Sequence, residues 1–203
     1  MAQPYNRASY LPALGDVDAE IGEFWIGNPW GFHGQRKNLS AYERNRLFLN
    51  AGNLRFEDVS YLSGTDSEGD GRASVAADFN RDGMPDLLVR QAGGGSLLLF
   101  ENHMPAKHYL DIRLRGGPSN RAAIGARVVA SVAGRTIVRD CFPANSFMSQ
   151  SPSELHFGLG DASELESLTV IWPSGDTQSF HHIAADNLIT IVEGSDKPHF
   201  WAR

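Results

Sequence analysis

The sequence contains only one cysteine, Cys141, among its 203 residues. An intrachain disulfide is therefore excluded, and with it the class of small secreted proteins that disulfide bridges hold together. Long hydrophobic runs are also missing, because the longest nearly apolar stretch, residues 97–100, is far too short to cross a bilayer. The first residues lack a basic stretch followed by an apolar one, so we expect no signal peptide in this chain.

Basic residues are scarce as well: 18 Lys and Arg stand against 24 Asp and Glu, which gives a net charge of −6. This balance argues against a nucleic-acid partner, whose recognition requires a basic surface. Hydrophobic residues make up 41% and charged residues 21%, the composition of an ordinary globular protein. The 21 glycines and 10 prolines are scattered along the chain, which indicates short elements and favours β structure.

Short strands separated by turn signals are predicted along most of the chain. Their ranges are 46–50, 55–59, 74–78, 86–90, 97–101, 110–114, 126–132, 136–142, 155–158, 168–172, 177–181 and 188–192. A capping box, SAYE at residues 40–43, predicts a short helix over residues 41–46. The sequence therefore predicts an all-β fold in two parts, of which the second is an antiparallel β-sandwich.

Four segments follow from this pattern. They are an extended aromatic-rich segment (1–45), a β repeat (46–104), the β-sandwich (105–194) and a C-terminal tail (195–203). Large aromatic residues lie in the first and last segments without strand or helix periodicity. Because exposed aromatics are favoured anchors at protein interfaces, four of them are predicted to bind a partner: Trp25, Trp30, Phe32 and Trp201.

The most specific motif is a loop of oxygen donors at residues 78–86. Side-chain oxygens occupy loop positions 1, 3, 5 and 9, a glycine follows at position 6, and a backbone carbonyl at position 7 adds a donor. Such spacing folds a short loop around one hard cation, and three carboxylates with neutral oxygens suit Ca²⁺ better than Mg²⁺. The alternative is a solvated acidic turn between two strands. The predicted metal ligands are Asp78, Asn80, Asp82, Met84 and Asp86.

Other candidate sites are weaker. Asp66, Glu68 and Asp70 repeat part of the spacing, but an exposed turn is the favoured interpretation over a second cation loop. His181 and His182 are adjacent in a predicted strand, so their side chains should point to opposite faces. Cys141, at a strand end, is expected to be buried and inert. No catalytic site is predicted, and the chain is expected not to be an enzyme.

Several runs resemble known families. Residues 45–50, 56–60 and 78–89 resemble a blade of the FG-GAP/VCBS repeat. The second part is similar to the ASPIC/UnbV domain of the cartilage acidic protein family, through residues 119–121, 124–127, 149–150, 155–160, 170–175 and 185–188. Together the resemblance covers roughly residues 45–193.

The resemblance implies that the first part is a partial propeller blade whose loop binds Ca²⁺ through Asp78, Asn80, Asp82 and Asp86. It also implies a periplasmic or extracellular interaction protein, and it supplies no catalytic residues. A closed propeller needs several blades, so the open edges of a single one must be covered. We therefore expect an accessory subunit that binds other protein subunits, for example in a membrane-associated complex. The alternatives are a UnbV-type biosynthetic tailoring enzyme and a glycan-binding module.

Overall fold

The computed structural model describes residues 9–10, 37–38, 44–67, 69, 71–91, 96–118, 120–142, 144–145 and 149–201. The chain divides into two compact units, each of which is discontinuous in sequence. The first comprises Met1–Ser74 and Leu88–Phe100, and the second comprises Val75–Leu87 and Glu101–Arg203. The second unit thus contains residues 75–87, which lie within the predicted repeat (46–104), and its longer segment begins at Glu101, close to the predicted boundary at residue 105.

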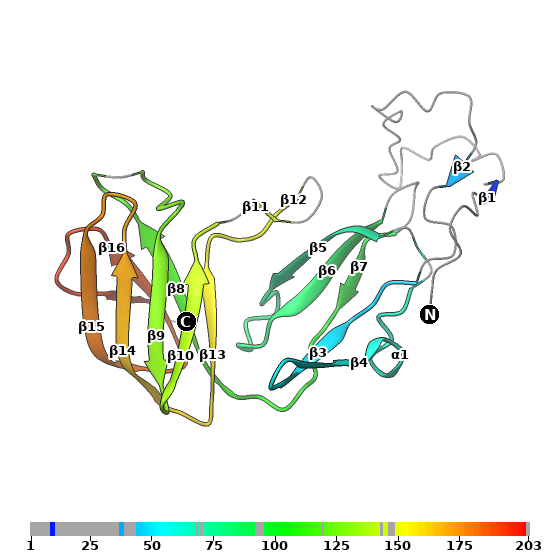
Figure 1. The fold of residues 1–203 in the computed structure, drawn as a ribbon, viewed down its shortest axis with the longest axis horizontal. Helices are drawn as coiled ribbons and strands as arrows, with labels where there is room; N and C mark the ends of the chain where they lie inside the picture. Colours follow the sequence, from blue (N-terminus) through cyan, green and yellow to red (C-terminus); the bar gives the residue numbers. More distant parts are fainter. Residues whose placement is uncertain are drawn as a thin grey trace. The chain divides into compact units, whose positions relative to one another are not determined.

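The strands that precede the sandwich form small sheets (Figure 1). β1 (Ser9–Tyr10) pairs with β2 (Lys37–Asn38), and β3 (Phe48–Gly52) forms an antiparallel hairpin with β4 (Arg55–Asp58). A single helical turn, α1 (Ser60–Ser63), follows the hairpin. The three-stranded sheet contains β5 (Gly71–Ala77), β6 (Asp86–Gln91) and β7 (Leu98–Phe100), in that order.

The helix predicted over residues 41–46 is wrong for residues 44–46, which have no regular structure, and residues 41–43 lie outside the described part. The reason is that the backbone here is held by distant residues. The amide of Asn45 donates to the carbonyl of Ser67 at 3.0 Å, and the amide of Leu47 donates to the hydroxyl of Ser60 at 2.8 Å. These tertiary hydrogen bonds override the local capping signal.

The C-terminal part of the chain forms two four-stranded sheets (Figure 1). One sheet has the order β10-β9-β14-β15, with β9 (Arg127–Val132), β10 (Arg135–Asp140), β14 (Glu164–Ile171) and β15 (Thr177–Ala184). The other has the order β13-β8-β16-β17, with β8 (His108–Arg115), β13 (Leu155–Gly160), β16 (Asn187–Val192) and β17 (His199–Trp201). A two-residue pair, β11 (Ala144–Asn145) with β12 (Ser149–Gln150), lies between β10 and β13 in the sequence.

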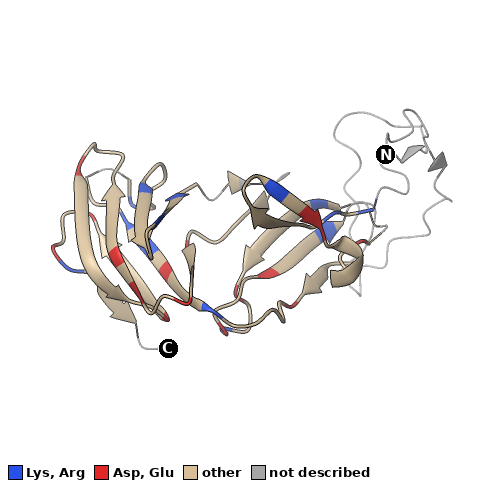
Figure 2. Cartoon of the chain, turned by 60° about the horizontal axis from the view of Figure 1, so that its bottom comes forward, with Lys and Arg blue, Asp and Glu red and all other residues tan. Residues whose placement is uncertain are grey.

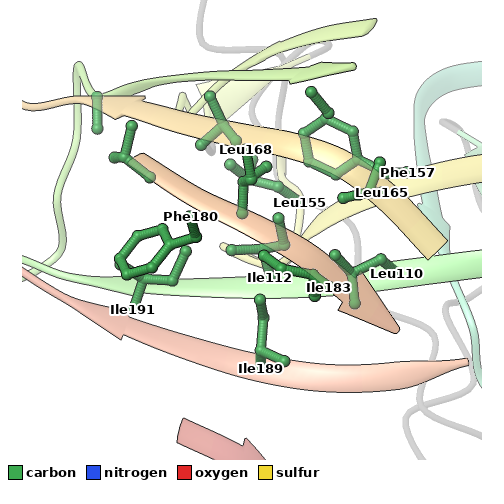
Figure 3. Packing of buried hydrophobic residues seen from close by; sticks show 14 of the residues in the cluster. Leu110, Ile112, Leu155, Phe157, Leu165, Leu168, Phe180, Ile183, Ile189 and Ile191 are labelled. Carbon is green, nitrogen blue, oxygen red and sulfur yellow. The ribbon is translucent and has the colours of Figure 1, made fainter. Parts of the chain in front are cut away.

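The hydrophobic core lies between these two sheets, as Figure 3 shows for part of the cluster. Leu110 and Ile112 from β8 and Leu168 from β14 are completely buried, because alternate residues of each strand face the other sheet. Trp172, just after β14, is also buried. The predicted all-β fold and the sandwich are therefore confirmed.

Two features of the sandwich differ from the prediction. β16 runs parallel to β8, whereas an antiparallel sandwich was predicted, because the chain crosses from β15 in one sheet to β16 in the other. Residues 199–201, assigned to a tail, form β17, where Trp201 is opposite Leu188 in the register with β16. Three residues are too few for their alternation to be recognised in the sequence.

Candidate functional site

The loop between β5 and β6 contains the predicted cation ligands, and its side-chain oxygens are held by its own backbone. Asp78 Oδ1 and Asn80 Oδ1 each accept a hydrogen bond from the amide of Asp82 at 3.1 Å, so these two oxygens converge on one point. Asp78 Oδ2 accepts from the amide of Gly83 at 2.9 Å. Asp82 Oδ1 accepts from the amide of Met84 at 2.7 Å. The side chains of Asp78, Asn80 and Asp82, at alternate positions of the loop, therefore hold its backbone in the folded turn.

Asp86 closes the base of the loop. Asp86 is buried, with only 2% of the residue accessible to solvent. Oδ2 accepts the amide of Phe79 at 3.0 Å, and Oδ1 accepts the amide of Asn102 at 2.9 Å. The carboxylate thus joins the first residues of the loop to the segment that follows β7.

The donor set has the chemistry of a calcium loop, with carboxylate oxygens and an amide oxygen on a backbone already folded into the required turn. Among the residues that the structure describes, no three Asp, Glu, His or Cys side chains are grouped as a ready cation cage. The carboxylates here serve as acceptors for backbone amides. The side chains of Asp78, Asn80 and Asp82 would have to rotate before they could surround a cation.

Gly83 is required by both its conformation and its surroundings. Its φ is +89°, in the region that favours glycine. A Cβ atom at this position would clash with Cε1 of Tyr109 in β8. The tip of the loop therefore packs directly against the ring of Tyr109, which is itself buried.

The second acidic run lies only partly within the described residues, since Glu68 and Asp70 are outside them. Asp66 is described, and its Oδ2 lies 2.7 Å from Nη1 of Arg44. This carboxylate is thus engaged by a guanidinium group.

The histidines of the sandwich take different positions. His156 is hydrogen-bonded within the sandwich, with Nδ1 at 2.8 Å from Oδ1 of the buried Asp111. His182 has a φ of +51°, and the β14–β15 register leaves it unpaired. The predicted alternation therefore fails there, and His181 and His182 both line an open groove of about 400 Å³ together with Phe200.

Cys141 is buried, as predicted, with 1% of its surface accessible. Its thiol lies 3.6 Å from the carbonyl of Ala122, and burial raises its pKa above the usual value. The thiolate, the reactive form, is therefore disfavoured.

The positions of basic and acidic residues are interspersed along the described strands (Figure 2). Three arginines of the sandwich have acidic or carbonyl partners, and one of them, Arg139, donates to the carbonyl of His156 at 3.1 Å. Arg113 pairs with Glu154 at 2.6 Å, and Arg127 pairs with Asp140 at 2.7 Å.

The β3–β4 hairpin carries an unusual number of exposed apolar side chains. Every residue of both strands is exposed. The exposed fractions are 56% for Phe48 and 61% for Phe56, and the following helical turn exposes Leu62 at 86%. We call the apolar side chains of this region the hairpin surface; it consists of Phe48, Leu49, Leu54, Phe56, Tyr61 and Leu62.

The predicted partner-binding aromatics are divided between two parts of the chain. Trp25, Trp30 and Phe32 lie outside the described residues. Trp201 is described, and 47% of it is exposed. Its indole N–H donates to the hydroxyl of Thr190 at 2.9 Å, and its ring meets His199 edge-on. Trp201 therefore packs on the sandwich and keeps about half of its surface available.

Sequence reasoning missed two residues at the loop, Glu101 and Tyr109. Glu101 Oε1 accepts a hydrogen bond from Asn80 Nδ2 at 3.0 Å, across 21 positions of sequence. No local pattern marks either residue, because each reaches the loop only through the fold. The hairpin surface carried a weak signal, since Phe48 and Leu49 are adjacent apolar residues that would occupy opposite faces of a strand.

Comparisons with known families match both parts of the chain. A family model described as an FG-GAP-like repeat matches residues 38–89, and one described as ASPIC and UnbV matches residues 116–198. No curated protein matches the chain.

Within the described part of the chain, no helix is long and apolar enough to span a membrane. FG-GAP-like repeats are typical of extracellular or periplasmic proteins and often serve as interaction modules. The chain is thus β-rich, and a region that matches an FG-GAP-like repeat is followed by one that matches an ASPIC and UnbV domain.

Proposed function

We propose that this chain is a non-catalytic, calcium-binding module that binds another protein, as an accessory subunit of a larger periplasmic or extracellular assembly. The observation that carries the proposal is the hairpin surface. Both strands of the β3–β4 hairpin are exposed, and large apolar side chains lie on them and on the turn that follows.

The physical argument concerns the packing of strands. A two-stranded hairpin alone is marginally stable in water, and a β-sheet gains its stability by burying a face against another layer. Exposed large apolar side chains that gather on one region mark interaction sites on soluble proteins. A partner that covers Phe48, Phe56 and Leu62 would supply the missing layer. Aromatic anchors of this type often contribute about 2 kcal/mol or more each to binding.

Calcium is proposed as a structural ion of the loop at residues 78–86. The ligands would be the side-chain oxygens of Asp78, Asn80, Asp82 and Asp86 with the carbonyl of Met84. The ion would neutralise carboxylates that the loop brings close together, and would thereby brace the turn that packs on Tyr109.

A non-catalytic role is supported by the state of the groups that could act as nucleophile or base. The thiol of Cys141 is buried with a raised pKa. His156 is held by Asp111, and His108 Nδ1 lies 2.7 Å from Asp186 Oδ2. Both histidines are thus engaged by carboxylates.

The experiment that tests the interaction is isolation of the protein from its native host under mild conditions, followed by identification of the proteins that remain with it. We expect a stoichiometric protein partner. Isolation as a lone chain that turns over a small molecule would favour the tailoring enzyme, and retention on a polysaccharide would favour the glycan-binding module.

The experiment that tests the calcium proposal is thermal unfolding with Ca²⁺ and with a chelator. Binding to the folded state alone stabilises by about 2.7 kcal/mol at a hundredfold excess over Kd. We expect this gain for the natural chain and its loss for Asp82→Ala, which removes a carboxylate from the loop. Identical unfolding midpoints with ion and with chelator would contradict the calcium proposal.

A further inference from the structure

The two sides of the sandwich at which edge strands of the two sheets meet are built differently. On the side of β10 and β13, Arg139 bridges the sheets: its Nε donates to the carbonyl of His156 at 3.1 Å, and its guanidinium lies 5.7 Å from the centre of the Phe157 ring. On the other side, the edge strands β15 and β17 border the open groove of about 400 Å³. The groove is therefore not simply a consequence of stacking two sheets.

The walls of this groove are fastened to each other by one side chain. Gln178, in β15, donates through Nε2 to the carbonyl of Ser195 at 2.6 Å, and its Oε1 accepts a hydrogen bond from the amide of Gly194 at 3.0 Å. These hydrogen bonds attach residues 193–198, which connect β16 to β17, to β15. A ligand would thus enter a groove that is already formed, and little conformational entropy would be lost on binding.

The groove has an apolar floor and an exposed aromatic ring. Phe180 and Ile183 line it from β15, and both are buried residues of the core. Phe200 lines it from β17 and is 47% exposed. The groove therefore offers a flat apolar surface, against which an apolar face of a ligand can pack.

A local distortion of β15 brings two imidazole rings to the groove. His182 has a φ of +51°, in the left-handed region that residues other than glycine rarely adopt. The alternation of the strand is broken there, so the adjacent His181 and His182 both line the groove. Nδ1 of His182 lies 3.4 Å from Oε1 of Glu164, which favours the proton on Nδ1 and leaves Nε2 as an acceptor.

The polar groups of the groove select for hydroxyl groups. Asp196 also lines it, and its carboxylate can only accept hydrogen bonds, whereas a neutral imidazole both donates and accepts. Each hydroxyl also donates and accepts, so it can satisfy both kinds of side chain, while the charge of Asp196 disfavours an anion. No group of three potential metal ligands occurs among the described residues, so a metal ion is not the expected occupant. A neutral pyranose sugar combines an apolar face with hydroxyl groups around its edge.

We propose that the groove between β15 and β17 binds a neutral saccharide. One face of a sugar ring packs on Phe200, and its hydroxyl groups form hydrogen bonds with His181, His182 and Asp196. The groove belongs to the second unit and the hairpin surface to the first, so this inference does not rest on the proposed partner binding. It adds a second ligand and is compatible with a protein partner.

The test is a nuclear magnetic resonance titration of the full ¹⁵N-labelled chain with cellotriose, maltotriose and N,N′,N″-triacetylchitotriose. We expect at least one of these saccharides to shift the amide signals of His181 and Phe200, with a Kd of about 1 mM. Phe200→Ala removes the stacking surface, and Asp196→Asn removes the charge of the acceptor, so each should raise Kd about tenfold. The amide spectra also show whether each variant is folded.

The matched control is Phe142→Ala, which removes an aromatic ring that is 67% exposed and does not line the groove. It should bind the saccharide like the natural chain. The variant Phe56→Ser/Leu62→Ser, which alters the hairpin surface, should also bind like the natural chain, and a loss there would contradict the separation of the two sites.

Two further results would overturn the proposal. One is the absence of shifts with all three saccharides at about 10 mM, tenfold above the expected Kd. The other is saccharide binding that Phe200→Ala and Asp196→Asn both retain at full strength, because the ligand would then lie outside the groove.

Discussion

The sandwich and the β3–β4 hairpin place apolar residues in opposite environments. In β13 of the sandwich, Leu155, Phe157 and Leu159 alternate with more exposed residues and are buried against the other sheet. In the hairpin, Phe48 and Phe56 are exposed although they belong to regular paired strands. The residue types are the same, and the difference is whether a second layer is present.

This contrast shows what strand formation alone achieves. Backbone pairing forms the hairpin, but pairing does not remove a side chain from water unless a further layer covers that face. The sandwich supplies its own layer, and a cluster centred on residues such as Ile112 and Leu168 results. The hairpin surface lacks such a layer within the described part of the chain, and we attribute its cover to the partner.

The largest difference in unfolding free energy is expected when one aromatic residue from each region is replaced. Phe157→Ala empties a fully buried site and should cost about 3–5 kcal/mol of unfolding free energy. Phe56→Ala removes an exposed ring from the isolated chain and should change it by about 0.5 kcal/mol or less. Urea unfolding followed by circular dichroism measures both. Similar losses for the two variants would mean that the hairpin surface is covered within the chain itself.

A smaller difference in unfolding free energy is expected between substitutions of two glycines with positive φ. Gly83→Ala introduces backbone strain and also a contact with Tyr109, so a loss of about 3 kcal/mol is expected. Gly134, in the β9–β10 turn, has a φ of +71° and no neighbouring atom within 4 Å of a Cβ. Gly134→Ala should therefore lose only the conformational part, about 1 kcal/mol. Equal losses would show that the loop does not pack on Tyr109 in solution.

The smallest effect concerns the acid stability of the hairpin. Hydrogen bonds from Ser60, together with the charge of Arg46, hold the pKa of Asp58 below its usual value of 3.8. A carboxyl whose pKa is lowered by folding stabilises the folded state above the unfolded pKa. That contribution is lost as the pH falls through the lower, folded pKa. The unfolding midpoint of Asp58→Asn should therefore fall less than that of the natural chain between pH 4 and strongly acidic solution, and parallel curves would contradict this.

The sequence predicted those parts of the fold whose pattern is local. Alternation in residues such as Leu110 and Ile112 predicted β8, and the spacing of Asp78, Asn80 and Asp82 predicted the loop. Features produced by distant contacts were missed. The backbone of residues 44–46 is not helical because Ser67 and Ser60 bind the amides of Asn45 and Leu47. Glu101 reaches the loop through a hydrogen bond with Asn80, 21 positions away in the sequence.

The grouping of residues 75–87 with the second unit also depends on distant contacts. Residues 75–87 were assigned to the repeat because their motif is typical of that family. They pack with the second unit because Gly83 meets Tyr109 and Asp86 binds the amide of Asn102. None of these contacts has a signal in the local sequence.

The measurement that tests the central claim most directly is recovery of the native partner by the hairpin variant Phe56→Ser/Leu62→Ser. The control is Ile124→Ser, which changes an apolar residue of the sandwich that is 45% exposed. Circular dichroism should show that both variants fold. We predict that the partner recovered with the natural chain is retained by the control and lost by the hairpin variant. Equal recovery with the folded hairpin variant would contradict the claim that the hairpin surface binds the partner.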